Sequence, residues 1–197
     1  MCIRDRVTPR DVIAAVDHIR ARTPMPVMAD VGDCLFAAVD LAPGPLIASG
    51  YYATMGMAVP AAIGVQASSG ERALVLVGDG AFQMTGAELA NASRLGCDPI
   101  VVVFNNASWA MLETFAGPSS RFALPTVDFA ALARAMGGDG FTITHCREID
   151  HALATAAATR GRFQLLDVRL APGAISERLD RFVGAANASA RAMPRVK

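Results

Sequence analysis

Short runs of valine, isoleucine, leucine and phenylalanine recur along the chain, and segments of helical periodicity lie between them. This alternation is typical of βα units, whose parallel strands are apolar throughout because helices cover both faces of the sheet. We therefore expect an α/β fold with a mostly parallel sheet and helices on both faces. The predicted strands are residues 27–29, 73–77, 100–104, 141–144 and 163–168.

The clearest helix signal begins at Thr85, because Thr85 and Glu88 have the spacing of a capping box. Gly96 is a typical residue to end that helix in the left-handed conformation. A second helix is predicted from about Asp128 to Met136, before two glycines. An alanine-rich stretch with Pro60 near its start predicts a third, closely packed helix.

Other segments have the composition of loops or ends. Residues 42–58 are rich in glycine, proline and small side chains, which favours close approach of the backbone to a ligand, and residues 116–125 are the best candidate for a mobile loop. The domain-like pattern covers residues 8–185. We expect residues 1–7 to be a non-native leader and residues 186–197 to be a flexible tail.

Composition limits the classes of function. A chain of 197 residues, 53% of them hydrophobic, is long enough for one well-buried core, so one domain is expected. The 18 basic and 18 acidic residues balance, which gives no reason to expect a nucleic acid or an acidic membrane as partner. No apolar run approaches the length of a membrane-spanning helix. The four cysteines lack metal-ligand spacing and favour reduced thiols in the cytoplasm.

Polar residues follow two consecutive predicted strands. Gly78, Asp79 and Gly80 close the first strand, Asn105 and Asn106 close the second, and residues 81–104 lie between the two groups. A strand, a crossover helix and a parallel strand place both groups at the carboxyl edge of the sheet, where open α/β sheets bind ligands. The oxygens of Asp79 and Asn106 can therefore converge.

A carboxylate and an amide oxygen suit Mg²⁺, which usually needs phosphate oxygens to complete its octahedron. The pattern therefore implies a phosphorylated cofactor. Gly78 and Gly80 allow close backbone approach, and the start of the Thr85 helix could direct free N–H groups toward a diphosphate. A Walker pattern is absent, which disfavours an ordinary P-loop nucleotide hydrolase.

The tripeptide alone is weak evidence, because Gly-Asp-Gly also occurs in haloacid dehalogenase-type phosphatases, in lipid kinases and in simple turns. The phosphatase version requires Asn-Asp soon after the second glycine, where this chain has Ala81, Phe82 and Gln83. An EF-hand loop would need oxygen ligands at alternate positions and a closing glutamate. Neither pattern fits.

Gly78 to Gly80, the 24-residue gap and the two asparagines together resemble the thiamine diphosphate signature. Residues 30–36, 50–56, 80–85, 105–109 and 160–164 look like the indolepyruvate/phenylpyruvate decarboxylase branch of thiamine diphosphate-dependent enzymes. The resemblance spans about residues 8–183 and implies the thiamine diphosphate-binding fold of the C-terminal domain, with thiamine diphosphate and Mg²⁺ as cofactors.

Carried over by motif, the resemblance implies that Asp79, the Asn106 side chain and the Ser108 carbonyl bind Mg²⁺. Met55 matches the bulky apolar residue that bends the cofactor, and the Ala53 carbonyl would meet its aminopyrimidine. Gly80 and Ala81 would lie against the diphosphate, opposite Gly32, Asp33 and Cys34. The implied cofactor-binding residues are Gly32, Asp33, Cys34, Ala53, Thr54, Met55, Gly78, Asp79, Gly80, Ala81, Asn106, Ser108 and Met111.

One position departs from the pyruvate decarboxylases, which have a proton-handling glutamate six residues after the second asparagine. This chain has Leu112 there; an apolar residue at this position resembles the aryl-pyruvate branch and fits a pocket for a larger, apolar 2-keto acid side chain. Glu113 is adjacent but points elsewhere on a helix, so no catalytic role is assigned to it. Trp109 and Phe115 fit either pocket walls or core packing.

The resemblance places the family's catalytic residues, a glutamate and a histidine pair, on a separate pyrimidine-binding domain. His18, His145 and His151 are scattered, and we expect them to face solvent. We therefore expect a fragment of a 2-keto acid decarboxylase that is inactive alone and homo-oligomeric when complete. The alternatives are an acetolactate synthase-like enzyme and a separately encoded, non-catalytic cofactor-binding subunit.

Overall fold

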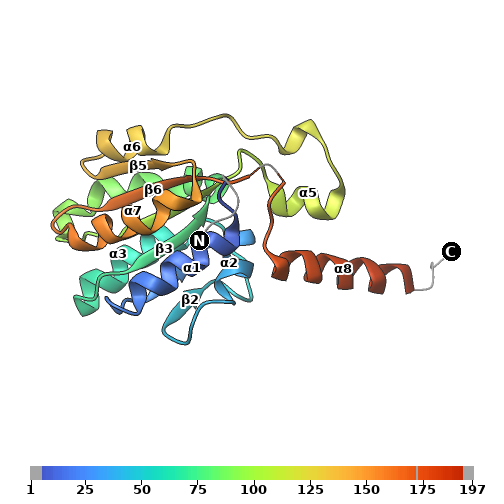
Figure 1. The fold of residues 1–197 in the computed structure, drawn as a ribbon, viewed down its shortest axis with the longest axis horizontal. Helices are drawn as coiled ribbons and strands as arrows, with labels where there is room; N and C mark the ends of the chain where they lie inside the picture. Colours follow the sequence, from blue (N-terminus) through green and yellow to red (C-terminus); the bar gives the residue numbers. More distant parts are fainter. Residues whose placement is uncertain (1–5, 172, 193–197) are drawn as a thin grey trace.

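The computed structural model describes residues 6–171 and 173–192, in which six parallel strands form one sheet in the order β2-β1-β3-β4-β6-β5 (Figure 1). The strands are β1 (Val27–Ala29), β2 (Leu46–Ala48), β3 (Leu74–Gly78), β4 (Ile100–Asn105), β5 (Asp139–Ile143) and β6 (Gln164–Arg169). The longer helices are α1 (Pro9–Arg20), α3 (Ala58–Ser69), α7 (Cys146–Ala158) and α8 (Glu177–Ala192). The shorter ones are α2 (Asp33–Ala38), α4 (Asp79–Thr85), α5 (Ala110–Ala116), α6 (Phe129–Ala135) and the 3₁₀ helices η1 (Gly86–Asn91), η2 (Ser93–Leu95) and η3 (Ser120–Phe122).

Helices cover both faces of the sheet, as the apolar strands predict. Alternate residues of a strand point to opposite faces, so Leu74 and Leu76 of β3 pack with α1, α2 and α7. Val75 and Val77 pack on the other face with α3, α4, η1 and α6. The five predicted strands all form, with ends that differ by at most two residues from those expected. The α/β prediction with a mostly parallel sheet is confirmed, and every strand pair is parallel.

The helix predicted to start at Thr85 begins earlier, so that prediction is wrong. α4 starts at Asp79, directly after β3, and the chain continues past Thr85 as the 3₁₀ helices η1 and η2. Thr85 makes no capping bond because its hydroxyl donates to the Gly56 carbonyl at 2.7 Å. Gly96 does end the segment in the left-handed conformation, with φ of 67°.

The other helix predictions agree more closely. α6 begins after Asp128, whose carboxylate accepts a hydrogen bond from the Ala131 N–H, and α3 contains Pro60 in its first turn. Residues 116–125 contain the short helix η3, and the N–H of Trp109 donates to the Phe122 carbonyl, so this segment folds back on the chain after β4. Mobility of that loop stays a prediction.

The two ends of the domain differ from the expected boundaries. Residues 1–5 of the predicted leader lie outside the described residues, but Val7 is fully buried and forms a β-bridge with Leu170, so it belongs to the core. Residues 186–192 of the predicted tail form the last part of α8, and residues 193–197 are not described. Two of the four cysteines, Cys34 and Cys97, are free and buried.

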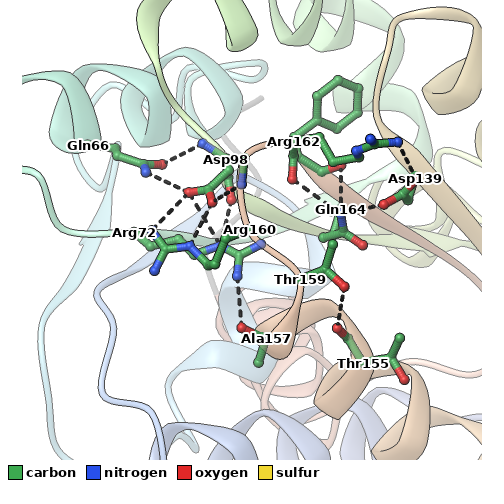
Figure 2. A network of polar contacts seen from close by, with 12 residues as sticks. Gln66, Arg72, Asp98, Asp139, Thr155, Ala157, Thr159, Arg160, Arg162 and Gln164 are labelled. Carbon is green, nitrogen blue, oxygen red and sulfur yellow. Dashed lines mark hydrogen bonds and ion pairs between the residues drawn. The ribbon is translucent and has the colours of Figure 1, made fainter.

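Figure 2 shows a polar network around Asp98, which precedes β4 and therefore lies at the amino-terminal edge of the sheet. The Asp98 carboxylate accepts hydrogen bonds from the side chains of Gln66 and Arg160, both at 2.7 Å, and from the Gly161 N–H. Arg72 donates to the Asp98 carbonyl. The network therefore joins the loops before β3, β4 and β6.

Among the described residues, every helix is too short or too polar to cross a membrane.

Candidate cofactor and metal site

The proposed metal ligands lie at the carboxyl edge of the sheet, where β3 and β4 end side by side. Gly78 of β3 is in register with Phe104 of β4, so the residues that follow each strand leave the sheet at the same level. Asp79 is the first residue of α4, and Asn106 follows the last residue of β4. The 24-residue crossover therefore brings the two groups together, as the spacing predicts.

The Asp79 side chain is a buried carboxylate, only 4% exposed. One oxygen accepts a hydrogen bond from the Gly80 N–H at 2.9 Å, and the other accepts one from the Ala107 N–H at 2.7 Å. Burial raises the pKa of Asp79 to about 6, although these backbone donors oppose the shift. Within the described part of the chain, no lysine, arginine or histidine pairs with this carboxylate.

The turn after β4 holds the other oxygens. Ala107 has a φ of 55°, a left-handed conformation that is unusual for a residue other than glycine and that concentrates at functional sites. The Asn106 side-chain oxygen accepts a hydrogen bond from the Ser108 N–H at 3.0 Å, and the Ser108 hydroxyl donates to Glu113 at 2.9 Å. The hydrogen bond from Ala107 to Asp79 ties this turn to α4.

This arrangement fits Mg²⁺. A buried carboxylate without a cationic partner, beside an amide oxygen and a strained turn, supplies hard oxygen ligands and a local negative charge. The described residues hold no group of three or more histidine, cysteine, aspartate or glutamate side chains, so the set differs from a zinc or di-metal centre. Few protein ligands leave coordination positions for phosphate oxygens and water.

Asp79, Asn106 and Ser108 line one pocket that opens between α2, α4 and α5. Eleven of the thirteen predicted cofactor-binding residues line it, and Ala53 and Thr54 do not. Gly78 leaves open space where a side chain would stand, which is the room that a ligand needs. The pocket is lined by Val31, Gly32, Asp33, Cys34, Met55, Gly78, Asp79, Gly80, Ala81, Phe104, Asn106, Ser108, Trp109, Ala110, Met111, Leu112 and Leu170.

The side opposite Asp79 is formed by the start of α2. Gly32 precedes the helix with a φ of 136°, which only glycine adopts readily. The Asp33 carboxylate accepts hydrogen bonds from the N–H and the hydroxyl of Ser176, and burial raises its pKa. The Asp33 carboxylate is thus held by hydrogen bonds from Ser176.

The Cys34 thiol is buried and donates to the Asp30 carbonyl at 3.1 Å, and burial raises its pKa, so a reactive thiolate is disfavoured.

Asp30 fixes the segment that carries Met55, a role that sequence reasoning missed. Its fully buried carboxylate accepts hydrogen bonds from the N–H groups of Val31, Gly56 and Ala58 at 2.8–2.9 Å. The apolar strand that ends directly before Asp30 was the available signal, since a carboxylate at that point lies at the ligand edge of the sheet.

Ala53 and Thr54 lie on the exposed part of the same segment. Ala53 has a φ of 52°, the second left-handed non-glycine conformation among the described residues, and the Ser49 hydroxyl donates to the Thr54 carbonyl at 3.0 Å. The structure thus holds the backbone of both residues in a defined bend, beside the pocket and outside its lining.

One wall of the pocket is apolar and comes mainly from α5 and the residue before it. Trp109, Met111 and Leu112 line the pocket, and the Trp109 ring lies directly over Gly80, where a methyl group would overlap it. Leu170, after β6, also lines the pocket and was missed because nothing in its sequence neighbourhood indicates a ligand. Phe115 is 42% exposed and lies outside the lining, so it is neither wall nor core.

The remaining residues considered from sequence take no part in the pocket. Glu113 points to Ser108 and is absent from the lining, as expected. His18 and His151 are exposed, as expected, whereas His145 is half-buried, and none of the three lines this pocket.

Known proteins resemble this chain over most of its length. Residues 30–168 match the family model described as the thiamine pyrophosphate enzyme, C-terminal TPP binding domain. Indole-3-pyruvate decarboxylase of Azospirillum brasilense is 52% identical over 180 residues, which cover 90% of this chain and 33% of that protein. An alpha-keto-acid decarboxylase of Mycobacterium tuberculosis (strain ATCC 25618 / H37Rv) is 31% identical over 166 residues, 80% of this chain and 30% of that protein. The acetolactate synthase large subunit of Haemophilus influenzae is 30% identical over 175 residues, 83% of this chain and 30% of that protein. The chain thus spans about a third of the length of the relatives it matches.

Proposed function

Because this chain belongs to the thiamine pyrophosphate enzymes and matches their C-terminal cofactor-binding domain, we propose that it holds thiamine diphosphate and Mg²⁺ for a 2-keto acid decarboxylase. The observation that carries the proposal is the buried Asp79 carboxylate, which has no cationic partner among the described side chains and shares its pocket with Asn106 and Ser108. A divalent cation would supply the missing positive charge.

In this proposal, Asp79, the Asn106 side chain and the Ser108 carbonyl bind Mg²⁺. Gly78, Gly80 and Ala81 lie against the diphosphate on one side, and Gly32, Asp33 and Cys34 lie on the other. Backbone N–H groups at the starts of α2 and α4 would donate to its oxygens, so no lysine is required. Bound thiamine diphosphate supplies an electron sink for cleavage of the bond between a keto carbon and a carboxylate.

Met55 would support the cofactor rings, and Asp30 positions it through the two hydrogen bonds that it accepts from the Gly56 and Ala58 N–H groups. The bend at Ala53 and Thr54 would present the Ala53 carbonyl to the aminopyrimidine. Met111 and the neighbouring apolar side chains of α5 would exclude water from the site. Low local polarity strengthens the electrostatic effect of each remaining polar group.

The substrate class we propose is aryl or indole pyruvates, which would yield an aldehyde and carbon dioxide. Leu112 stands where a proton-handling glutamate would stand in a pyruvate decarboxylase, and it lines the pocket with Trp109. This apolar wall suits a larger side chain than the methyl group of pyruvate. The name of the Azospirillum relative, which is 52% identical, supports the same class.

The proposed activity needs more than this chain. The relatives are about three times as long, and we infer that a pyrimidine-binding domain in the remaining length, or in a partner subunit, supplies the catalytic residues. We further propose that the complete protein is a homo-oligomer in the cytoplasm. Residues 8–185 would form the cofactor domain together with Val7, which is part of the core, and with residues 186–192, which continue α8.

A chimera tests the proposed activity. This chain would replace the equivalent C-terminal third of the Azospirillum relative, and carbon dioxide release from indolepyruvate, phenylpyruvate and pyruvate would be measured. We expect turnover of the two aryl substrates, none with the Asp79→Ala chimera and none with the isolated chain. A folded chimera that condenses two pyruvates to acetolactate and spares aryl pyruvates would favour the acetolactate synthase alternative.

A further inference from the structure

Helix α8 lies outside the residues matched by the family model, yet it contacts two helices that flank the pocket. It follows the last strand and extends away from the layered body on the side of α5 (Figure 1). Its contacts are to α2, which begins at the pocket, and to α5, which forms the apolar wall. α8 thus contacts two helices whose residues line the pocket.

The first turns of α8 are fixed to the body. Ser176, directly before the helix, donates from its N–H and hydroxyl to the buried Asp33 carboxylate, and its hydroxyl accepts a hydrogen bond from the Leu179 N–H. Leu179 and Val183 are buried on one face, and the Arg178 guanidinium donates to Asp40 at 2.6 Å. The helix therefore starts at a defined place beside α2.

Phe182 joins the two sides of the pocket through aromatic contacts. Its ring lies 5.2 Å from that of Phe36 on α2 and 6.1 Å from that of Phe115 on α5, in the latter case nearly perpendicular at 84°. Both separations fall within the range of favourable aromatic pairs. Phe182 therefore lies between the two helices.

α5 has little other support. None of its seven residues is fully buried, and its main contacts are to α8 and to η3. Met111 and Phe115 are four residues apart, so they lie on the same side of this short helix. A contact that holds Phe115 thus also sets the position of Met111 in the pocket wall.

We propose that α8 positions α5, and with it the apolar wall of the pocket, and that Phe182 is the positioning residue. Loss of the Phe182 ring removes the aromatic contact between α8 and α5, while the contact of α5 with η3 remains. The consequence for a keto acid side chain, which would contact that wall, rests on the proposed function. The proposal that α8 sets the position of α5 does not depend on the proposed function.

Trp109 reports on this position, because it precedes the first residue of α5 and is the single tryptophan of the chain. Its ring rests on Gly80 and lines the pocket. Movement of α5 would expose that ring to solvent. The fluorescence of the chain is therefore a local measure of the wall, and it needs neither cofactor nor substrate.

The test compares acrylamide quenching of Trp109 in the wild type, Phe182→Ala and Phe182→Tyr, without cofactor. We expect the quenching constant to rise about twofold in Phe182→Ala, as in a locally opened segment, and to stay at the wild-type value in Phe182→Tyr, which keeps the ring. Leu132→Ala is the matched control, because Leu132 is similarly exposed on α6, and it should leave quenching unchanged.

Circular dichroism checks that each variant is folded. If Phe182→Ala fails to fold, Phe115→Ala removes the same ring contact from the α5 side and should give the same rise. Unchanged quenching in a folded Phe182→Ala or Phe115→Ala variant would overturn the proposal. A rise in quenching together with no thiamine diphosphate binding by the wild type would support the role of α8 and contradict the proposed function.

Discussion

At the scale of single residues, Asp30 shows how a buried carboxylate can shape the site without touching a ligand. It accepts three backbone hydrogen bonds and fixes the segment before α3. We expect Asp30→Ala to destabilise the chain by on the order of 3 kcal/mol, because buried N–H donors lose their partner. Urea denaturation measures this.

The matched control is Asp40→Ala, which removes an exposed carboxylate paired with Arg178 and should cost less than about 1 kcal/mol. Equal losses in the two variants would show that the hydrogen bonds of Asp30 contribute nothing special to the fold.

Asp98 gives a prediction about pH. Burial alone would raise its pKa, but hydrogen bonds from Arg160, Gln66 and Gly161 and the charge of Arg72 outweigh burial and lower it (Figure 2). A carboxylate with a lowered pKa stabilises the fold above its unfolded value, about 3.9, and that stabilisation is lost as the pH falls through the lower folded value.

We therefore expect Asp98→Asn to be less stable than the wild type by on the order of 3 kcal/mol at pH 7, with the difference shrinking below about pH 4. Thermal unfolding as a function of pH measures the gap. Asp150→Asn, at an exposed ion pair with His18, should follow the wild-type curve. A stability difference between Asp98→Asn and the wild type that stays constant with pH would contradict the lowered pKa of Asp98.

Much of the site could be predicted residue by residue, because glycine, aspartate and asparagine at strand ends carry a strong signal. The structure brings Asp79, Asn106 and Ser108 into one pocket. Leu170 could not be predicted, because an apolar residue after a strand looks the same whether it faces a pocket or the core. The hydrogen bond between Asp33 and Ser176 could not be predicted from a local sequence pattern either, since 143 positions separate the two residues.

At the scale of secondary-structure elements, two glycines differ in the space that is available for a side chain. Gly140 of β5 lies against the backbone of Ala130 in α6, where a methyl group would overlap the carbonyl. Gly64 lies in α3 with open space where its side chain would be. Gly140→Ala should cost about 2 kcal/mol or more from overpacking. Gly64→Ala should stabilise by about 0.5–1 kcal/mol through its better helix propensity.

Chemical denaturation of the two variants beside the wild type measures both changes. A stabilised Gly140→Ala chain would show that β5 can move away from α6, and the close packing of the two elements would then be disproved.

The elements that sequence predicts well are those with a full apolar pattern. Three of the interior strands, β3, β4 and β6, are buried along almost their whole length, so their runs of valine, isoleucine and leucine stand out. β2 was missed because it has three residues, lies at the sheet edge and is largely exposed. The sequence predicts a tail for the last part of α8 because, among the described side chains of this helix, only those in its first turns are apolar and buried.

The early start of α4 has a different cause. Two sequence features indicate different starts for this helix: the capping-box spacing indicates Thr85, and the end of the strand at Gly78 indicates a start directly after it. The tertiary hydrogen bond from Thr85 to Gly56 removes the cap, and the helix then begins where the strand ends. A local pattern cannot report a bond to a segment 29 residues away.

At the scale of the whole molecule, the two edges of the sheet differ in the features that they carry. The amino-terminal edge is closed by the Asp98 network, and the carboxyl edge carries the pocket, the strained turns and the helix starts. The Asp98 network thus stabilises the fold at the edge opposite the proposed ligand site. Variants at Asp98 should therefore lower stability without changing the affinity for a ligand at Asp79.

The central claim is that Asp79 helps bind a magnesium ion with thiamine diphosphate, and calorimetric titration tests it directly. Thiamine diphosphate is titrated into the wild type and into Asp79→Ala, with and without Mg²⁺. The account predicts binding to the wild type only when Mg²⁺ is present and none to the variant. If the wild type shows no binding, the titration is repeated with a pyrimidine-binding partner domain added, and no binding there would contradict the account.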